Sequence, residues 1–479
     1  MTDASRDGFV EMGYGHFAFS NYYPSAPTYP LPPSYASQHP GLIAAPNAEH
    51  HSFTDSGLHA NALGSMLSTG YGSSVQASDY AASPILHDFT GLHVFNEQSP
   101  WLGVYRLDIQ LAADSNLKSE ASLSIDGAVE CDFRRSFAEK GHIDARKLSA
   151  GSHTIYLRTS ATKIHVDLRF DSGALKVTQL RLMQGTNRPW RKVFSDAFSS
   201  LQYPDGGGMT LNHPTGNLKD YLPMLDFDSR VLGIEVWNHL TSGFGSGRGF
   251  YDSSGEPCLH FYKLWDDILR SGRRCWGFFV KDHNTFERGR NVLLLPDLNG
   301  ASVGERERAA LVAYRNGTFF GSVAAMTVDS TGHVVAPFDH SEFRFSHISV
   351  ARDALGRPSA IKVAVTGHNT TKRPNVVIRF VTDKGIAHVV TAANAEYSLK
   401  RTESGALEDA FVRIEAFAAP VTHLQGKPLS PQVLAQMNVH DISLLHDSMM
   451  SRSSKSGGAL RKPVPIVDMI FSQALQRAP

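Results

Sequence analysis

Three stretches in the middle of the chain decide the expected fold: Val231-Leu-Gly-Ile-Glu-Val-Trp237, then Leu259 to Leu269, then Trp276-Gly-Phe-Phe-Val280. The first and third are apolar runs of the length of a buried strand, whereas the second has its apolar residues at helical spacing. Buried strands that alternate with helices are typical of parallel βα units. The chemistry of such folds lies at the carboxyl ends of the strands.

The same alternation extends to either side of these stretches. We expect helices over residues 191–201, 218–225 and 306–315, and strands over residues 41–46, 209–213 and 292–296. These segments and the three central ones together predict an α/β region.

Two other regions have the pattern of antiparallel strands. Apolar and polar residues alternate in Val104-Tyr-Arg-Leu-Asp-Ile-Gln-Leu111 and in Ile164-His-Val-Asp-Leu168, with turn residues between such runs. Similar strands return in the last third of the chain, for example in Val376-Val-Ile-Arg-Phe-Val381. We therefore expect four parts: an α/β region over 1–88, an inserted jelly-roll-like β-sandwich over 89–185, a second α/β part over 186–318, and a C-terminal β-sandwich over 319–479.

Composition narrows the classes of partner and location. The 479 residues include 46 Lys plus Arg and 46 Asp plus Glu, so net charge gives no reason to expect nucleic acid or a membrane as partner. The cysteines, Cys131, Cys258 and Cys275, form no zinc-type spacing and fit structural thiols in a reducing compartment. No secretory signal or membrane span is visible in the sequence, so we expect a cytoplasmic protein.

Histidines and acidic residues cluster where the predicted strands end. The clusters contain the following candidates: His16, Glu49, His59, His213, Glu235, Asn238, Lys281, Asp282 and His283. Imidazole and carboxylate groups that converge at one edge of a sheet suit zinc, manganese or iron. Glu235 lies in an apolar strand, where a carboxylate must be paired or coordinated to be tolerated.

The order of these motifs resembles the PHP (polymerase and histidinol phosphatase) superfamily, and within it the branch of carbaryl-hydrolase-like metallohydrolases. The matching stretches are PNAEH at 46–50, LHANALG at 58–64, LNHP at 211–214, GIEVWN at 233–238 and KDH at 281–283. The resemblance implies a distorted (β/α)7-like barrel that carries the two sandwiches. It also implies a divalent metal ion (Zn, Mn or Fe) held by His16, Glu49, His59, His213 and His283.

The chain departs from the family pattern at two ligand positions. Ala18 stands where the family has the second histidine of an HxH motif, and Lys281 stands where it has the aspartate of a DxH motif. A lysine ammonium close to the site disfavours the binding of a cation. We therefore expect a degenerate site that holds one ion or none.

Three functions follow from these residues. The first is hydrolysis of a phosphoester, ester or carbamate-like bond by metal-activated water, with Lys281 or Arg290 stabilising negative charge. The second is a metal-independent glycoside hydrolase that uses Glu49, Glu235 and Asp282 as its carboxylates. The third is a non-catalytic binding protein on a degenerate barrel. The expected ligand is a small molecule or a glycan, and the sequence leaves the oligomeric state open.

Overall fold

The computed structural model describes most of the chain. The described residues are 7, 9–10, 13–20, 29, 31, 33–50, 53–65, 71–77, 85–92, 104–113, 120–130, 142–159, 161–170, 175–185, 189–214, 218–238, 260–280, 289–325, 342–423, 427–443, 445–452 and 459–476. They belong to two compact units, one made of residues 16–209 and the other of residues 1–15 and 210–479. Each unit is described by itself below.

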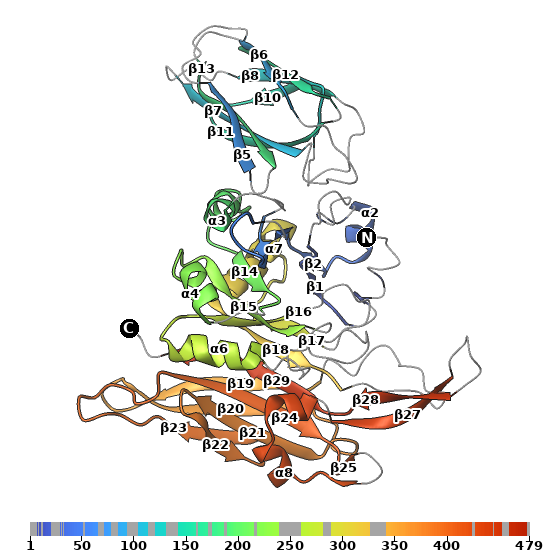
Figure 1. The fold of residues 1–479 in the computed structure, drawn as a ribbon, viewed down its shortest axis with the longest axis vertical. Helices are drawn as coiled ribbons and strands as arrows, with labels where there is room; N and C mark the ends of the chain where they lie inside the picture. The colour runs from blue at the N-terminus through green and yellow to red at the C-terminus, as the bar shows by residue number, and fades with distance from the viewer. Residues whose placement is uncertain are drawn as a thin grey trace. The chain divides into compact units, whose positions relative to one another are not determined.

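The unit of residues 16–209 contains two facing antiparallel sheets (Figure 1). One has the order β10-β8-β12-β6, from strands His142–Leu148, Ala121–Asp126, Lys163–Phe170 and Ile85–Thr90. The other has the order β5-β13-β7-β11-β9, from strands Tyr71–Ala77, Leu175–Gly185, Val104–Ala113, Gly151–Arg158 and Val129–Glu130. The sheet-rich, sandwich-like character predicted for this region is confirmed.

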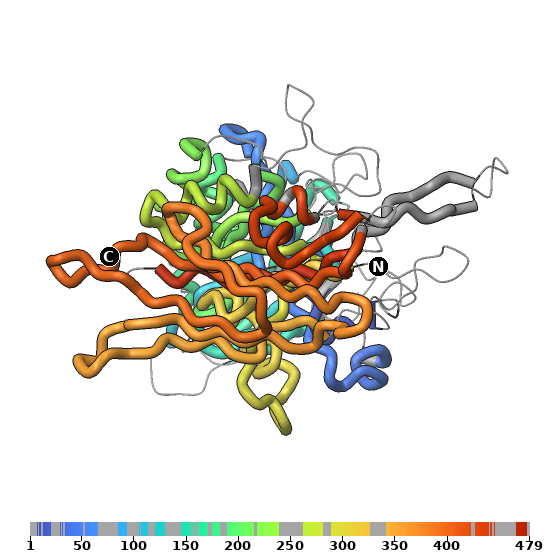
Figure 2. The backbone as a smooth tube through the Cα atoms, turned by 90° about the horizontal axis from the view of Figure 1, so that it is seen from below, coloured from blue at the N-terminus to red at the C-terminus, as the bar shows by residue number. Residues whose placement is uncertain are grey.

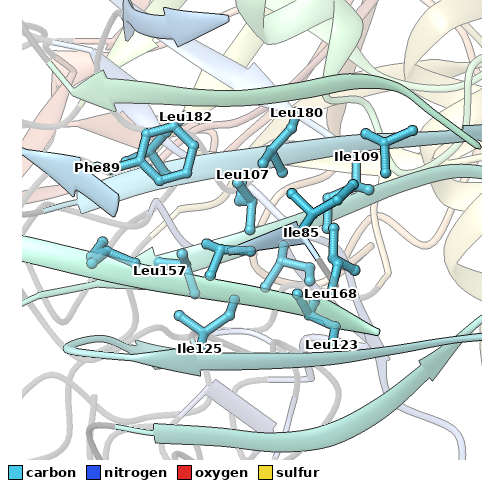
Figure 3. Packing of buried hydrophobic residues seen from close by; sticks show 14 of the residues in the cluster. Ile85, Phe89, Leu107, Ile109, Leu123, Ile125, Leu157, Leu168, Leu180 and Leu182 are labelled. Atoms are coloured by element: carbon cyan, nitrogen blue, oxygen red, sulfur yellow. The ribbon is translucent and has the colours of Figure 1, made fainter. Parts of the chain in front are cut away.

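Strand alternation builds the core between these two sheets. In β12, Ile164, Val166 and Leu168 are fully buried, whereas the residues between them are more exposed. Leu107 and Leu180 of the opposite sheet are also buried in this core. Figure 3 shows Leu107, Leu168 and Leu180 in a layer of aliphatic side chains that has Phe89 at one end. A period of two therefore sends one face of each strand into the core.

The rest of this unit consists of short elements. Strands β1 (His16–Phe17) and β2 (Ile43–Ala44) pair in parallel, and β3 (Glu49–His50) pairs antiparallel with β4 (His59–Leu63). Helix α2 spans Pro33–Gln38, and helix α3 spans Trp190–Ser199. The backbone N–H of Trp190 donates to Asp55 Oδ1 at 2.9 Å, which satisfies one of the free donors at the start of α3.

The longer segment of the other unit, residues 210–479, begins within strand β14 (Gly208–Asn212). Helix α4 (Leu218–Leu225), strand β15 (Val231–Asn238), helix α6 (His260–Arg270) and strand β16 (Trp276–Val280) follow. Strands β15 and β16 pair in parallel, as the alternating pattern predicts. Trp265 of α6 is fully buried and donates from Nε1 to Cys275 O at 2.9 Å, which fixes the helix against the start of β16.

The parallel arrangement does not continue beyond β16. The side-chain amide of Asn291 donates to Phe279 O and accepts from Phe279 N, both at 3.0 Å. The amide of Gln473 does the same for Gly277, at 2.8 and 3.0 Å. Two side chains thus satisfy backbone groups of β16 that a further strand would otherwise pair.

The next strands join the C-terminal sheet instead. Strand β17 (Gly289–Leu293) pairs antiparallel with β18 (Phe319–Val323), and β18 pairs antiparallel with β29 (Asp468–Ser472). The sheet continues through β24 (Phe411–Ala419), β21 (Asn375–Thr382) and β22 (Gly385–Val390), and β30 (Leu475–Gln476) pairs with β24. Helix α7 (Val303–Asn316) connects β17 to β18, with a capping box of Ser302 and Glu305 at its start and Gly317 in the left-handed region at its end.

A three-stranded sheet covers one face of this large sheet. It has the order β19-β20-β23, from Arg344–Arg352, Pro358–Thr366 and Asn394–Ser398, and Figure 2 shows its strands beside those of the large sheet in orange. Ile361 and Val363 of the small sheet share one core with Ile378 and Ile414 of the large sheet. The remaining described elements are β25 (Thr422–His423), β26 (Lys427–Pro428), α8 (Pro431–Gln436), α9 (Val439–Ser443), β27 (His446–Arg452) and β28 (Ala459–Pro465).

The prediction of a (β/α)7-like barrel is wrong. The described strands form several separate sheets, none of which closes, and strand content far exceeds helix content. The physical reason lies at β16, where Asn291 and Gln473 take the place of the next parallel strand. None of the helices in the described ranges has the length and apolarity needed to cross a membrane.

Candidate metal-binding residues

His213 has an unusual backbone. It directly follows β14 and has a φ of 43°, in the left-handed region that few residues without glycine's freedom adopt. Among the described residues other than glycine, only Ala145 also has a positive φ. Backbone strain of this kind costs about 1–3 kcal/mol and persists only where the surroundings hold it in place.

The side chain of Glu235 keeps the backbone of His213 in this conformation. It lies in the middle of β15 with a relative exposure of 1%. Its Oε2 accepts a hydrogen bond from the backbone N–H of His213 at 2.7 Å and lies 2.9 Å from Nδ1 of the same residue. One carboxylate oxygen therefore fixes both the strained peptide and the imidazole ring.

This contact determines which ring nitrogen of His213 carries the proton. A proton on Nδ1 lets the ring donate to the Glu235 carboxylate, and it places the lone pair on Nε2, the nitrogen that can then coordinate a metal ion. The side-chain amide of Asn238, at the end of β15, also lies 3.0 Å from this Nδ1, and with Nδ1 protonated the amide oxygen must be the group that faces the ring. A carboxylate that orients a histidine in this way is a recurring feature of metal sites.

The second oxygen of Glu235 is also informative. Oε1 is buried and has no hydrogen-bond partner among the described residues. A buried carboxylate oxygen normally accepts at least one hydrogen bond or binds a cation. The site thus offers an unsatisfied anionic acceptor beside an oriented imidazole, which is a fit for a positively charged ligand.

A second carboxylate–imidazole pair lies in the unit of residues 16–209. Glu49 and His59 occupy the antiparallel hairpin of β3 and β4, in which Glu49 is opposite Asn61. Glu49 Oε1 lies 3.6 Å from His59 Nδ1, and the two side chains are 5% and 38% exposed. A buried carboxylate beside an accessible imidazole is a donor set that zinc and manganese accept.

A polar network that the sequence analysis did not single out lies around this hairpin. Asn47, two residues before Glu49, donates from Nδ2 to Ala18 O at 2.9 Å and to Ser20 Oγ at 3.1 Å. Ser20 in turn donates to Asn61 Oδ1 at 3.0 Å. The motif PNAEH contains a sequence signal for this network. Its asparagine, Asn47, lies among apolar residues, and a buried asparagine side chain must form hydrogen bonds.

His16 has a different environment. Its Nδ1 lies 3.2 Å from Ile43 O across the β1–β2 pair, and burial lowers its pKa from 6.5 to about 4, partly opposed by that hydrogen bond. The ring is therefore neutral near pH 7. Among the described residues, however, His16 does not belong to the group of close potential ligands that includes Glu49 and His59.

The remaining predicted residues divide into two sets. Lys281, Asp282 and His283 lie outside the described residues. Arg290 lies in β17, where burial lowers its pKa and the charges of Tyr14 and Asp468 oppose that shift. The Nε of Arg290 is buried without a hydrogen-bond partner in the described part of the chain.

Comparison with known proteins gives no family for this chain. No protein-family model matches the sequence, and no curated protein matches it.

Proposed function

We propose that the chain is a metal-dependent hydrolase and that His213, held by Glu235, is a ligand of its divalent ion. The substrate class is an ester, phosphoester or carbamate-like bond. Imidazoles and carboxylates are the protein ligands of many catalytic zinc sites, which leave a coordination position for water. Within its own unit, the pair of Glu49 and His59 offers one group of each kind.

One observation carries this proposal: the strained backbone of His213 is fastened to the buried carboxylate of Glu235. A structural histidine has no need of a φ of 43°, whereas a ligand must present Nε2 in one direction. The order of motifs that resembles the PHP superfamily supports the same class of reaction.

The residues of the chain have separate roles in this proposal. His213 is a ligand, and Glu235 and Asn238 are positioning residues that hold its ring. Glu49 and His59 are a second pair of potential ligands in the unit of residues 16–209. A bound divalent ion would lower the pKa of a water ligand towards about 7 and so supply a hydroxide nucleophile near neutral pH. The negative charge of Glu235 also strengthens the donor character of His213.

The test uses the full-length chain freed of metal by a chelator and then supplied with Zn²⁺ or Mn²⁺. Hydrolysis of p-nitrophenyl acetate and p-nitrophenyl phosphate is measured in the wild type and in His213→Ala, with His347→Ala, an exposed histidine of β19, as the matched control. We expect metal to restore activity in the wild type and the control but not in His213→Ala.

Two results would count against the proposal. Hydrolysis that survives both chelation and the loss of His213 would remove the metal from the reaction. Cleavage of a p-nitrophenyl glycoside in excess chelator, lost in Glu49→Gln, would instead support the metal-independent glycoside hydrolase.

A further inference from the structure

A cavity of about 530 Å³ lies in the unit of residues 1–15 and 210–479, far in the sequence from Glu49 and His59. Its lining comes from strands β16, β19, β20, β24 and β30 and from the segment 399–409. Ile361 and Val412 are buried, and with Leu399 they make the interior apolar. This volume and lining are typical of a site for a small molecule with an apolar body.

Positive charge gathers in the lining of this cavity. Arg274, Arg352 and Lys400 all line it, and Asp409 is the single carboxylate there. Asp409 is already paired, because it accepts from Tyr397 Oη at 2.7 Å and from Lys384 Nζ at 3.2 Å. The cavity therefore has an excess of cations over free carboxylates.

Two of these cations are available to a ligand. Arg352 and Lys400 are exposed, and within the described part of the chain neither forms an ion pair. Arg352 Nη1 donates to Gly356 O at 2.6 Å, which anchors the guanidinium and leaves its other nitrogens for a second acceptor. Arg274 is more constrained, because it donates to Ser229 O and Val231 O.

An aromatic wall completes the cavity. Trp276 is half-buried, and the guanidinium of Arg274 lies 5.5 Å from the centre of its ring. The indole Nε1 donates to Arg315 O at 3.3 Å, which holds the ring in place. A fixed aromatic wall next to an arginine suits a ligand that has both an apolar body and an anionic end.

We infer that this cavity binds a small organic carboxylate whose apolar body packs on Ile361, Leu399 and Trp276. The carboxylate pairs with Arg352 and Lys400. The inference is independent of the proposed hydrolase function, because it rests on other residues and requires no metal.

The test compares two soluble probes that differ in their charged group, 4-phenylbutyrate and 4-phenyl-1-butanol. Their affinities for the full-length, metal-free chain are measured by isothermal titration calorimetry. We expect the acid to bind more tightly than the alcohol. The double variant Arg352→Gln/Lys400→Gln should weaken binding of the acid by about tenfold, since each exposed ion pair contributes about three- to fivefold, and leave the alcohol unchanged.

Two further variants separate the cavity from general effects. Arg344→Gln removes an exposed arginine of the same strand β19 that does not line the cavity, and should change neither affinity. Leu475→Trp adds bulk to a partly exposed lining residue and should abolish binding of both probes. Equal affinities of the acid and the alcohol, an unchanged double variant, or no binding of the acid would each overturn the inference.

Discussion

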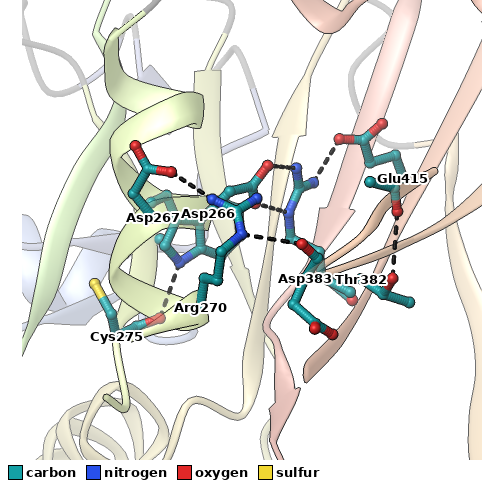
Figure 4. A network of polar contacts seen from close by, with 12 residues as sticks. Asp266, Asp267, Arg270, Cys275, Thr382, Asp383 and Glu415 are labelled. Atoms are coloured by element: carbon teal, nitrogen blue, oxygen red, sulfur yellow. Dashed lines mark hydrogen bonds and ion pairs between the residues drawn. The ribbon is translucent and has the colours of Figure 1, made fainter. Parts of the chain in front are cut away.

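Two buried polar clusters in the unit of residues 1–15 and 210–479 differ in how completely their charges are paired. The first joins α6 to the large sheet: Arg413 donates to Asp266 at 2.7 and 3.0 Å and also to Glu415, and Arg379 donates to Glu415 at 2.9 Å. Figure 4 labels its two carboxylates, Asp266 and Glu415. The second is the pair of Glu235 and His213. Both clusters pair carboxylates with basic side chains.

In the first cluster, two arginines balance two carboxylates. Burial would raise the pKa of Glu415, but Arg379 and Arg413 outweigh it and the pKa is lowered. The guanidinium groups of Arg379 and Arg413 also lie 4.6 Å and 5.1 Å from the rings of Phe417 and Trp265. The second cluster has a strained backbone at His213 and an unsatisfied oxygen on Glu235. Complete pairing indicates a structural role, and incomplete pairing with strain indicates a ligand-binding role.

The largest expected effect is on the paired cluster. Glu415→Gln leaves two buried guanidinium groups with one carboxylate, so the free energy of unfolding should fall by about 3–5 kcal/mol. Urea denaturation followed by circular dichroism measures this change. Glu396→Gln, in an exposed pair with Lys362 at 3.6 Å, is the control and should change it by less than about 1 kcal/mol. Similar values for both variants would remove the distinction between the clusters.

The pH dependence of stability tests the environment of His16. Its folded pKa of about 4 lies below the ordinary 6.5, so between these values the unfolded chain takes up a proton that the folded chain does not. Stability should therefore be intact above about pH 6.5 and fall by up to about 3 kcal/mol as the pH drops to 4. His16→Gln should remove this part of the dependence, and the exposed His347→Gln should not. A slope that His16→Gln leaves unchanged would contradict the assignment.

A smaller effect is expected at the incompletely paired cluster. Glu235→Gln keeps the size of the side chain but loses the charge that orients His213, so the affinity for Zn²⁺ should fall by about 10- to 100-fold. Calorimetric titration of metal-free protein measures it, with Glu396→Gln again as control. If Zn²⁺ binds equally well to Glu235→Gln, this carboxylate does not position a ligand.

The smallest effect is expected at the edge of the paired cluster. Arg270 donates to Asp383 O at 2.9 Å and pairs with Asp267, but its side chain is 48% exposed (Figure 4). Arg270→Gln should therefore lower the free energy of unfolding by about 1 kcal/mol or less in urea denaturation. A loss as large as that of Glu415→Gln would show that depth does not determine the contribution of a charge here.

The sequence predicts the local elements well and their assembly poorly. Apolar runs and helical spacing gave β15, β16, α6 and α7 close to their observed bounds, because these signals are local. The barrel prediction failed because βα alternation looks the same whether or not a sheet closes. That Asn291 and Gln473, 182 positions apart in the sequence, would both satisfy the backbone of β16 has no local signal.

The candidate site was predicted in part for similar reasons. A carboxylate in an apolar strand and a histidine before a proline drew attention to Glu235 and His213. The positive φ of His213 and its direct contact with Glu235 depend on the three-dimensional path of the chain. The cluster of Arg352, Lys400 and Trp276 was not predicted, because its residues come from distant segments of the sequence that meet only in the folded unit.

The coordination of a bound ion tests the central claim most directly. Zinc-edge X-ray absorption of the full-length chain, loaded with one equivalent of Zn²⁺, reports the ligands through the scattering pattern of imidazole rings. We predict imidazole scattering in the wild type and a loss of imidazole scattering in His213→Ala. A wild-type spectrum without imidazole, or one that His213→Ala leaves unchanged, would contradict the account.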